Sequence, residues 1–356
     1  MKVSFIAPGL HRTRGGERVI FRYAEAMGLA GNDVTVIIPK GSCQLTSNII
    51  KIVEYCPFFS TFISHQTGYF DAIPNIIKNI PNNVDVIIST YLPQAICGII
   101  AKKKNPNAKL VLFNQDFGAM FDRRPERKLM FSYYPKYFDL VISISEFCAS
   151  EIYRYSKVKS IIIPNGIEEP FLINNINAER NYILWVGSKN RHKGFKEFYE
   201  AMQIVWIIFP AIKVKVVGGY DVDHKNIEYA SPKGDIDQLI NLYSHAQLFV
   251  CSSYEEGFGL PALEAMACGC PVITTDTGGC REYAINGINC EMCQPRNSKI
   301  LSRSIIHLLN NPKICQKYSE EGLVTVKKFN WNYATSKFIE VINRLVKTNL
   351  PISKNN

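Results

Sequence analysis

Short, almost wholly apolar runs rich in β-branched residues recur along the chain, and they constrain its fold more than any other feature. In the first half, the runs cover residues 3–7, 34–38, 86–88, 110–113, 140–144 and 160–163. Strands of a parallel sheet that is covered by helices on both faces have this character. Between the first two runs, apolar residues from Val19 to Ala30 repeat at helical spacing, and Gly31 follows them as a stop. This alternation predicts a doubly wound α/β sheet.

The second half repeats the pattern, with strand-like runs at residues 182–186, 214–217, 248–251 and 272–275. An apolar helical stripe runs from Phe195 to Phe209, and Pro210 ends it. A length of 356 residues suits two domains. We place the first at residues 1–167 and the second at 168–330. Residues 331–356 then form a C-terminal helix that crosses back to the first domain, followed by a tail.

The chain carries a formal net charge of +10, of which +7 falls in residues 1–168 and +3 in the rest. Basic surface favours partners that carry phosphate, such as nucleotides, nucleic acid or anionic lipid. No apolar run approaches the roughly 20 residues that a membrane-spanning helix needs. The N-terminus opens directly on a strand pattern, so we expect no signal peptide and a cytoplasmic protein. The 11 cysteines lack a second matched pair for zinc and are expected to be reduced.

The most specific motif runs from Glu256 to Gly269, with the sequence EGFGLPALEAMACG, and follows the strand-like run 248–251. Pro261 suits the first turn of a helix and Gly269 its end. The segment therefore predicts a strand, a glycine loop and a helix, whose N-terminus attracts phosphate or sugar oxygens. Glu256 stands just before the helix and Glu264 one turn inside it. Acidic residues are common at helix starts, but the surrounding glycines and proline favour two carboxylates that accept hydrogen bonds from sugar hydroxyls.

This motif resembles the E-x7-E signature of retaining glycosyltransferases of family 4, which have the GT-B fold. Other segments are similar to the family in the same order along the chain. They are the glycine loop Gly15-Gly16-Glu17-Arg18-Val19, the interdomain segment Pro164-Asn165-Gly166-Ile167, the loop Val186-Gly187-Ser188 with Lys193-Gly194, and the segments 269–273 and 278–282. The resemblance implies two Rossmann-like domains that face each other, with the active site between them.

The resemblance also implies roles for individual residues. Lys193 binds the donor diphosphate, and Gly16 approaches the diphosphate from the other domain. Glu256 contacts the transferred sugar and Glu264 the ribose. The backbone of Gly257, Phe258, Gly259 and Leu260 holds sugar or phosphate oxygens. The donor is a nucleotide-diphosphate sugar, the anomeric configuration is retained, and no metal or other cofactor is required.

Two departures from the family pattern stand out. Family members often carry Arg where this chain has Ser188 or His192, and Arg191 is then the candidate for the missing donor-binding cation. A neutral histidine would bind a diphosphate less strongly than arginine. Asp116 replaces a frequent histidine of the family after the strand at 110–113. It is a candidate catalytic residue that faces the acceptor hydroxyl, although an aspartate that caps a nearby turn is an equal alternative.

A basic and aromatic stretch suggests a further partner. Residues 120–134 interleave Arg123, Arg124, Arg127 and Lys128 with apolar and aromatic residues, and Lys102-Lys103-Lys104 adds to the charge. Such a surface could lie on anionic lipid as a peripheral membrane contact and meet a lipid-linked acceptor. An ordinary amphipathic helix with a solvated basic face is the alternative.

We therefore expect a hexosyltransferase of the EC 2.4 class. It moves a hexose-type sugar to a saccharide or lipid-linked acceptor in glycan or cell-surface polysaccharide synthesis. A sugar-nucleotide epimerase or a phosphorylase on the same architecture is the alternative. A dinucleotide oxidoreductase is disfavoured, because no G-x-G-x-x-G follows the first strand. Charge alone suggests a nucleic-acid binder, and no motif that reads nucleic acid supports it.

Overall fold

The computed structural model of the chain describes residues 1–56, 72–118, 125–172 and 179–348. Its contacts divide it into two compact units. The N-terminal unit comprises Met1–Asn165 together with the C-terminal segment from Asn332, and the C-terminal unit is Gly166–Trp331. Each unit is described by itself below.

The N-terminal unit is built on a parallel sheet of seven strands within the described residues, in the order β3-β2-β1-β4-β5-β6-β7. The strands are β1 (Lys2–Ile6), β2 (Asp33–Pro39), β3 (Lys51–Tyr55), β4 (Val86–Ser89), β5 (Lys109–Asn114), β6 (Leu140–Ser143) and β7 (Ile161–Ile162). Every side chain of β4 and β6 is buried, as expected for central strands covered on both faces.

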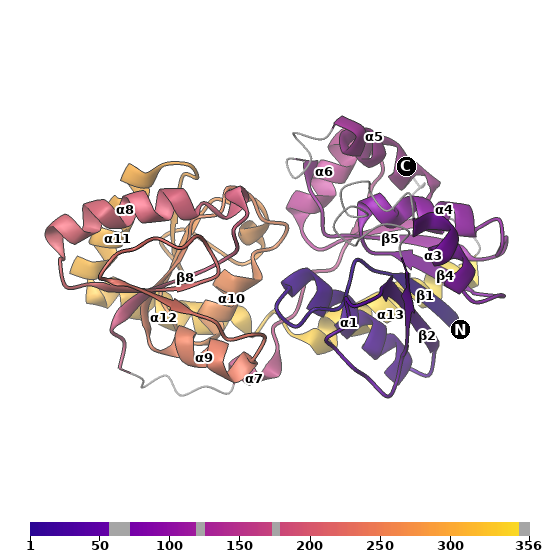
Figure 1. Cartoon of the computed structure of the whole chain (residues 1–356), viewed down its shortest axis with the longest axis horizontal. Coiled ribbons are helices and arrows are strands. Elements are labelled where there is room, and N and C mark those ends of the chain that lie inside the picture. Colours follow the sequence, from indigo (N-terminus) through magenta and orange to yellow (C-terminus); the bar gives the residue numbers. More distant parts are fainter. Residues whose placement is uncertain (57–71, 119–124, 173–178, 349–356) are drawn as a thin grey trace. The chain divides into compact units, whose positions relative to one another are not determined.

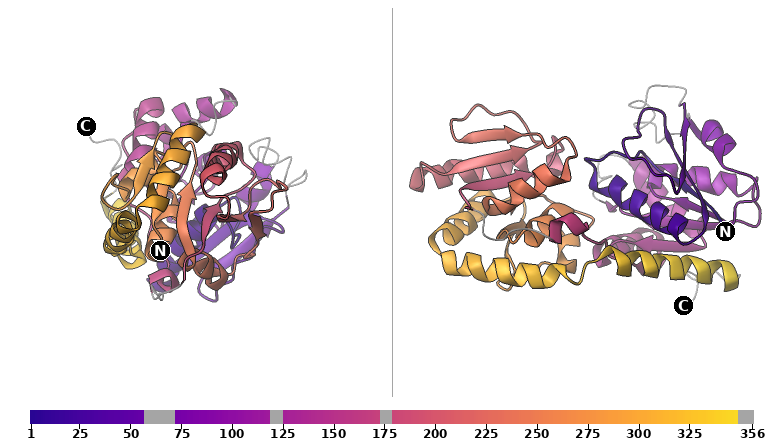
Figure 2. Two further views of the ribbon diagram at one scale, coloured as in Figure 1. Left: turned by 90° about the vertical axis from the view of Figure 1, so that its left-hand side faces the viewer. Right: turned by 90° about the horizontal axis from the view of Figure 1, so that it is seen from below.

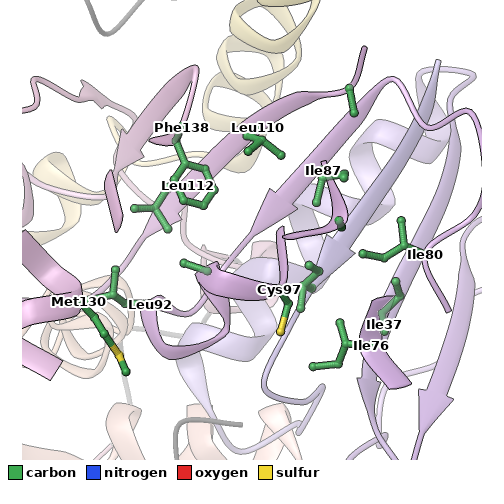
Figure 3. Packing of buried hydrophobic residues seen from close by; sticks show 14 of the residues in the cluster. Ile37, Ile76, Ile80, Ile87, Leu92, Cys97, Leu110, Leu112, Met130 and Phe138 are labelled. Carbon is green, nitrogen blue, oxygen red and sulfur yellow. The ribbon is translucent and has the colours of Figure 1, made fainter. Parts of the chain in front are cut away.

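Helices cover both faces of this sheet (Figure 1). Their bounds are α1 (Gly15–Leu29), α3 (Ile73–Asn79), η2 (Leu92–Gln94), α4 (Ala95–Ala101), α5 (Pro125–Tyr133), η4 (Tyr134–Tyr137), α6 (Glu146–Ser156) and α13 (Trp331–Thr348). On one face, α3 and α4 bury an apolar cluster against the sheet, which includes Ile37, Ile76, Ile87 and Leu112 (Figure 3).

Helix α13 packs against the other face of the N-terminal sheet. The ring of Phe338 lies 4.5 Å from that of Tyr23 on α1 and 5.9 Å from that of Phe113 on β5. Phe338 is fully buried. Helices α1 and α13 therefore lie side by side (Figures 1 and 2), and α13 completes the apolar core of the N-terminal unit.

The C-terminal unit has a parallel sheet of six strands among the described residues, in the order β10-β9-β8-β11-β12-β13. The strands are β8 (Tyr182–Val186), β9 (Lys213–Val217), β10 (Ile227–Ala230), β11 (Ala246–Cys251), β12 (Val272–Thr275) and β13 (Glu291–Cys293). The helical segments are α7 (Glu169–Leu172), η5 (Arg191–Lys193), α8 (Phe195–Ile208), α9 (Ile236–Ser244), α10 (Leu260–Ala267), η6 (Gly279–Glu282), α11 (Ser298–Asn310) and α12 (Pro312–Val326).

Both sheets have a point where the direction of the strand order reverses. In the N-terminal sheet it lies between β1 and β4, and in the C-terminal sheet between β8 and β11. Ligands of doubly wound folds bind beyond the carboxyl ends of the strands at such a point. The segments that follow β8 and β11 contain Lys193 and Glu256, respectively.

The predicted α/β architecture with two doubly wound sheets is confirmed. The strand-like runs of the sequence all correspond to strands, with small shifts of their ends. Strands β3, β10 and β13 were not predicted, and each is an outermost strand of its sheet.

Candidate active site

The glycine loop before α10 is held by close backbone contacts. Gly259 caps the helix with a φ of +88°, a backbone conformation that side chains disfavour. Its carbonyl accepts a hydrogen bond of 2.6 Å from the hydroxyl of Tyr283. Phe258 is buried against the ring of Tyr283, and Leu260 and Pro261 open the helix. The loop thus directs the N-terminus of α10, the positive end of the helix dipole, to the carboxyl end of β11.

Glu256 is fixed by the loop that follows β12. Its backbone N–H donates to Thr277 O at 3.0 Å, and its carbonyl accepts from Gly279 N at 3.1 Å. A Cβ on Gly279 would lie 2.3 Å from Gly257 O, so only glycine allows the two loops to approach this closely. The Oγ of Ser253 donates to Glu256 Oε1 at 2.6 Å and orients the carboxylate.

Lys193 meets Glu256 directly. The Nζ of Lys193 lies 2.7 Å from Glu256 Oε1, and the two side chains are 29% and 16% exposed. Burial opposes the charge on Lys193, but the Glu256 carboxylate outweighs it and raises the lysine pKa, so the amine stays cationic. Gly194 follows with a φ of +65°, and a Cβ there would collide with Ser252 O, so close packing on the end of β11 positions Lys193.

Glu264 is placed on α10 and faces α9. The residue is 3% exposed, and its Oε2 accepts a hydrogen bond of 3.1 Å from the hydroxyl of the buried Tyr243. Glu256 at the start of the loop and Glu264 inside the helix thus have different surroundings. The Glu256 carboxylate contacts the Lys193 ammonium group and the Ser253 hydroxyl. The Glu264 carboxylate accepts a hydrogen bond from the Tyr243 hydroxyl.

The other donor-binding candidates of this unit lie on the loop after β8. Ser188 Oγ accepts from Asn190 N at 3.4 Å, and His192 N donates to Asn190 Oδ1 at 3.0 Å. Arg191 is exposed, and its charge lies close enough to Tyr254 to oppose the rise that burial causes in the pKa of that phenol, whose hydroxyl donates to Glu197 Oε1 at 2.6 Å. The loop therefore brings Lys193, but not Arg191, to Glu256.

The remaining two candidates lie in the N-terminal unit, beyond the carboxyl ends of β1 and β5. Gly16 is in the first turn of α1, and its carbonyl accepts from Gln115 Nε2 at 3.1 Å. Asp116 is 6% exposed, and its Oδ2 accepts from Leu92 N at 3.2 Å, at the start of η2. Burial raises the pKa of Asp116 to about 6, against the opposing effects of Leu92 N–H and Arg127. The buried Asp116 carboxyl group thus caps the start of η2.

No group of three or more His, Cys, Asp or Glu side chains is arranged to hold a metal ion among the residues that the structure describes. The 11 cysteines are free thiols. Burial raises the pKa of Cys290 and Cys293 to about 12, so both are protonated thiols at neutral pH.

The C-terminal unit therefore combines a cationic amine, a helix N-terminus and a carboxylate beyond the ends of β8 and β11. Such a set can bind an anion through Lys193 and the α10 amides, and a hydroxyl-rich group through Glu256. The sequence indicated these elements. It did not point to Ser253 and Tyr243, whose hydroxyls orient the two carboxylates, because their roles depend on which strands and helices are neighbours.

Comparisons with family models identify the family of the chain. The model described as glycosyl transferases group 1 matches residues 167–324, and the model described as Glycosyltransferase Family 4 matches residues 13–169. The resemblance found in the motifs is thus confirmed. The chain belongs to the group 1 glycosyltransferases, has the GT-B fold and is a transferase enzyme.

Two curated relatives illustrate the match. An uncharacterized glycosyltransferase of Methanocaldococcus jannaschii is 27% identical over 79% of this chain and 81% of its own length. An N,N'-diacetylbacillosaminyl-diphospho-undecaprenol α-1,3-N-acetylgalactosaminyltransferase of Campylobacter jejuni is 26% identical over 49% of this chain. The match to the C. jejuni enzyme spans about half of the relative, 47% of its length.

Solved structures share the fold over almost the whole chain. Sucrose-phosphate synthase from Thermosynechococcus elongatus superimposes with a TM-score of 0.83, at 19% identity, and covers 98% of this chain and 99% of its own. Anabaena HepE in complex with UDP and glucose has a TM-score of 0.80 at 15% identity, and covers 96% and 99%.

Proposed function

We propose that the protein is a retaining glycosyltransferase that moves a hexose-type sugar from a nucleotide-diphosphate sugar to a saccharide or lipid-linked acceptor. The observation that carries this proposal is the 2.7 Å contact between Lys193 and Glu256 at the N-terminus of α10. It joins a phosphate-binding cation to a sugar-binding carboxylate at the reversal point of the C-terminal sheet. Glu264 then binds the ribose, and the amides of residues 257–260 bind sugar or phosphate oxygens.

The relatives support this choice of substrates. The structure of HepE holds UDP and glucose, and the C. jejuni enzyme is named for a diphospho-undecaprenol acceptor. A nucleoside diphosphate presents two phosphates and a ribose, which are the groups that Lys193 and Glu264 are suited to bind.

The transfer follows from where charge develops. The bond from the anomeric carbon to the diphosphate oxygen breaks, and the acceptor hydroxyl oxygen forms the new bond on the same face. The proton of the acceptor hydroxyl passes to the departing phosphate oxygen. Lys193 and the α10 amides stabilise the diphosphate anion, and such preorganised groups contribute several kcal/mol, typically about 3 per donor. Because these cationic and amide groups belong to the chain, we propose that no metal is required.

The N-terminal unit supplies the acceptor side in this proposal, with Gly16 near the donor diphosphate and Asp116 near the acceptor hydroxyl. If the Asp116 carboxylate receives a hydrogen bond from that hydroxyl, turnover rises as the pH passes upward through about 6, where Asp116 ionises. A pH–rate profile of Asp116→Asn that keeps the wild-type rise would remove Asp116 from this role.

We also propose that the enzyme works at the cytoplasmic face of a membrane, with an anionic lipid surface as a partner of its basic N-terminal unit. Within the described residues, no helix is both long and apolar enough to cross a bilayer. Of the basic stretch that suggested lipid contact, Met120, Phe121, Arg123 and Arg124 lie outside the described residues. Helix α5 carries Arg127, Lys128, Leu129 and Tyr133.

A panel of nucleotide-diphosphate sugars, read by release of the nucleoside diphosphate, tests the proposed function. Release that depends on added saccharide or lipid-linked acceptor, with a product of retained anomeric configuration by NMR, supports it. Interconversion of the donor sugar without release would indicate an epimerase, and release driven by inorganic phosphate a phosphorylase. A chelator that abolishes the transfer would contradict metal independence.

A further inference from the structure

Seven lysines gather at one edge of the N-terminal sheet. In a parallel sheet, the segments that lead into the strands meet at the amino edge. The segments that lead into β5, β6 and β7 are residues 102–109, 134–139 and 157–160, and their only acid is Asp139. Their lysines are Lys102, Lys103, Lys104, Lys109, Lys136, Lys157 and Lys159. The three strands are consecutive in the sheet, with starts roughly 5 Å apart, so the lysines form one cationic surface.

Most of this charge is not neutralised by the chain itself. Asp139 accepts a hydrogen bond of 2.8 Å from Leu110 N and lies 3.5 Å from Lys102 Nζ. In the part of the chain that the structure describes, the other six lysines have no carboxylate within 4 Å. Lys103, Lys136 and Lys157 are exposed.

Exposed aromatic rings accompany the lysines. Tyr133, Tyr137 and Tyr153 are 53%, 62% and 48% exposed. The Nζ of Lys136 lies 5.1 Å from the ring centre of Tyr133, and that of Lys157 lies 5.5 Å from the ring centre of Tyr153. Helices α5 and α6 lie side by side in the N-terminal unit (Figure 1), and η4 contacts both of them. Tyrosine rings beside cations are typical of surfaces that lie at the boundary between lipid headgroups and acyl chains.

We propose that these seven lysines, with Tyr133, Tyr137 and Tyr153, form a lysine edge that binds an anionic lipid bilayer. The inference rests on the membrane contact of the proposed function and places that contact at the amino ends of β5, β6 and β7, at the edge of the sheet opposite Gly16 and Asp116. A lipid surface fits better than nucleic acid, because the three rings offer apolar area that a headgroup layer accepts. Each lysine near an anionic surface strengthens binding roughly fivefold at moderate salt.

Vesicle sedimentation of the full chain tests the lysine edge. The probes are vesicles of phosphatidylcholine alone and of phosphatidylcholine with phosphatidylglycerol. The test variant combines Lys103→Glu, Lys136→Glu and Lys157→Glu. The matched control carries the same change of charge at exposed lysines of the C-terminal unit, Lys299→Glu, Lys313→Glu and Lys327→Glu. We expect wild type to bind only the vesicles that contain phosphatidylglycerol. The test variant should bind these vesicles at least about 100-fold more weakly, whereas the affinity of the control should fall less than tenfold.

Equal losses in the two triple variants would overturn the proposal, since they would reflect total charge and not a surface. Binding to phosphatidylcholine alone, or binding of polyuridylate in place of vesicles, would also overturn it. A second test variant, Tyr133→Ser with Tyr137→Ser, should lose the part of vesicle binding that resists high salt; unchanged binding would contradict the role of the rings. Release of nucleoside diphosphate in lipid-free solution should match wild type in all variants, so a failure of the lysine edge is distinguishable from a failure of the proposed transfer.

Discussion

Lys193 and Glu256 are each other's counter-ion, so the two side chains cannot be interpreted separately. The two residues lie 63 positions apart in the sequence, on the loops after β8 and β11, and Ser253 adds a second contact to the same carboxylate oxygen. The motif allowed Lys193, Glu256 and Glu264 to be predicted, because glycine and proline positions constrain the backbone around them. Ser253 and Tyr243 were not predicted, since a hydroxyl acquires its role only from the three-dimensional neighbours.

We predict that Lys193→Met and Glu256→Gln each reduce turnover by about 100-fold or more, because each removes a group aimed at developing charge. Steady-state nucleoside diphosphate release measures this. Lys189→Met is the matched control on the same loop: Lys189 pairs with Asp221 at 3.5 Å and is 67% exposed. Near-normal turnover in the Lys193 and Glu256 variants would contradict the proposed site.

Glu264→Gln should act mainly on donor binding. The Gln amide keeps the shape and the contact with Tyr243 but loses the negative charge toward ribose hydroxyls. We expect the donor KM to rise about tenfold, with a smaller change in kcat. An unchanged donor KM would argue against ribose binding by this residue.

The raised pKa of Asp116 predicts how the stability of the native state depends on pH. Its pKa is raised by burial, from the ordinary 3.8 to about 6, so the native state holds its proton at a higher pH than the unfolded chain does. The ionised form therefore costs native stability, and that cost grows as the pH rises from about 4 to about 6 and persists above. Asp116→Asn should be more stable than wild type at pH 7 by at most about 3 kcal/mol, with little difference at pH 4. Urea denaturation at both pH values measures this, and a difference that is independent of pH would contradict it.

At the scale of elements, the strands that were predicted and those that were not differ in their surroundings. The buried strands are apolar on both faces and are visible as apolar runs. Strands β3, β10 and β13 lie at sheet edges, and most of their positions are half-buried or exposed, such as the exposed Glu228 and Tyr229 of β10. A strand with one partner and partial cover lacks the continuous apolar pattern that local sequence reasoning depends on.

The loops at residues 256–257 and 278–279 approach each other so closely that a side chain on Gly279 should disturb the position of Glu256. Gly279→Ala places a methyl group against two carbonyl oxygens, 2.3 and 2.4 Å away, and must push the loop of Glu256 aside. We expect turnover to fall at least tenfold, because misplacement of a catalytic group by about 1 Å is costly. Gly287→Ala is the control: its φ of +74° strains the backbone, but nothing lies within 4 Å of the new methyl. Equal turnover in the two variants would contradict the argument.

At the scale of the whole molecule, the two units differ in continuity. The C-terminal unit is one stretch of sequence, whereas the N-terminal unit needs both its first 165 residues and α13. Phe338 shows why, since its ring is wholly buried among the rings of the N-terminal core. We predict that a fragment of residues 166–331 folds and binds UDP, and that a fragment of residues 1–165 aggregates. Circular dichroism and calorimetry of the two fragments test this, and a stable, monomeric 1–165 fragment would contradict it.

The position of α13 has a consequence for biosynthesis. Domains usually fold in the order in which the ribosome releases them. Here, the N-terminal unit cannot be completed when its first 165 residues emerge, because its helix α13 is translated only after every residue of the other unit. The exposed apolar groove beside α1 is then a point at which chaperones would act on the nascent chain, and a premature stop codon before residue 332 would leave the catalytic loops of the second unit intact but the first half without its closing helix.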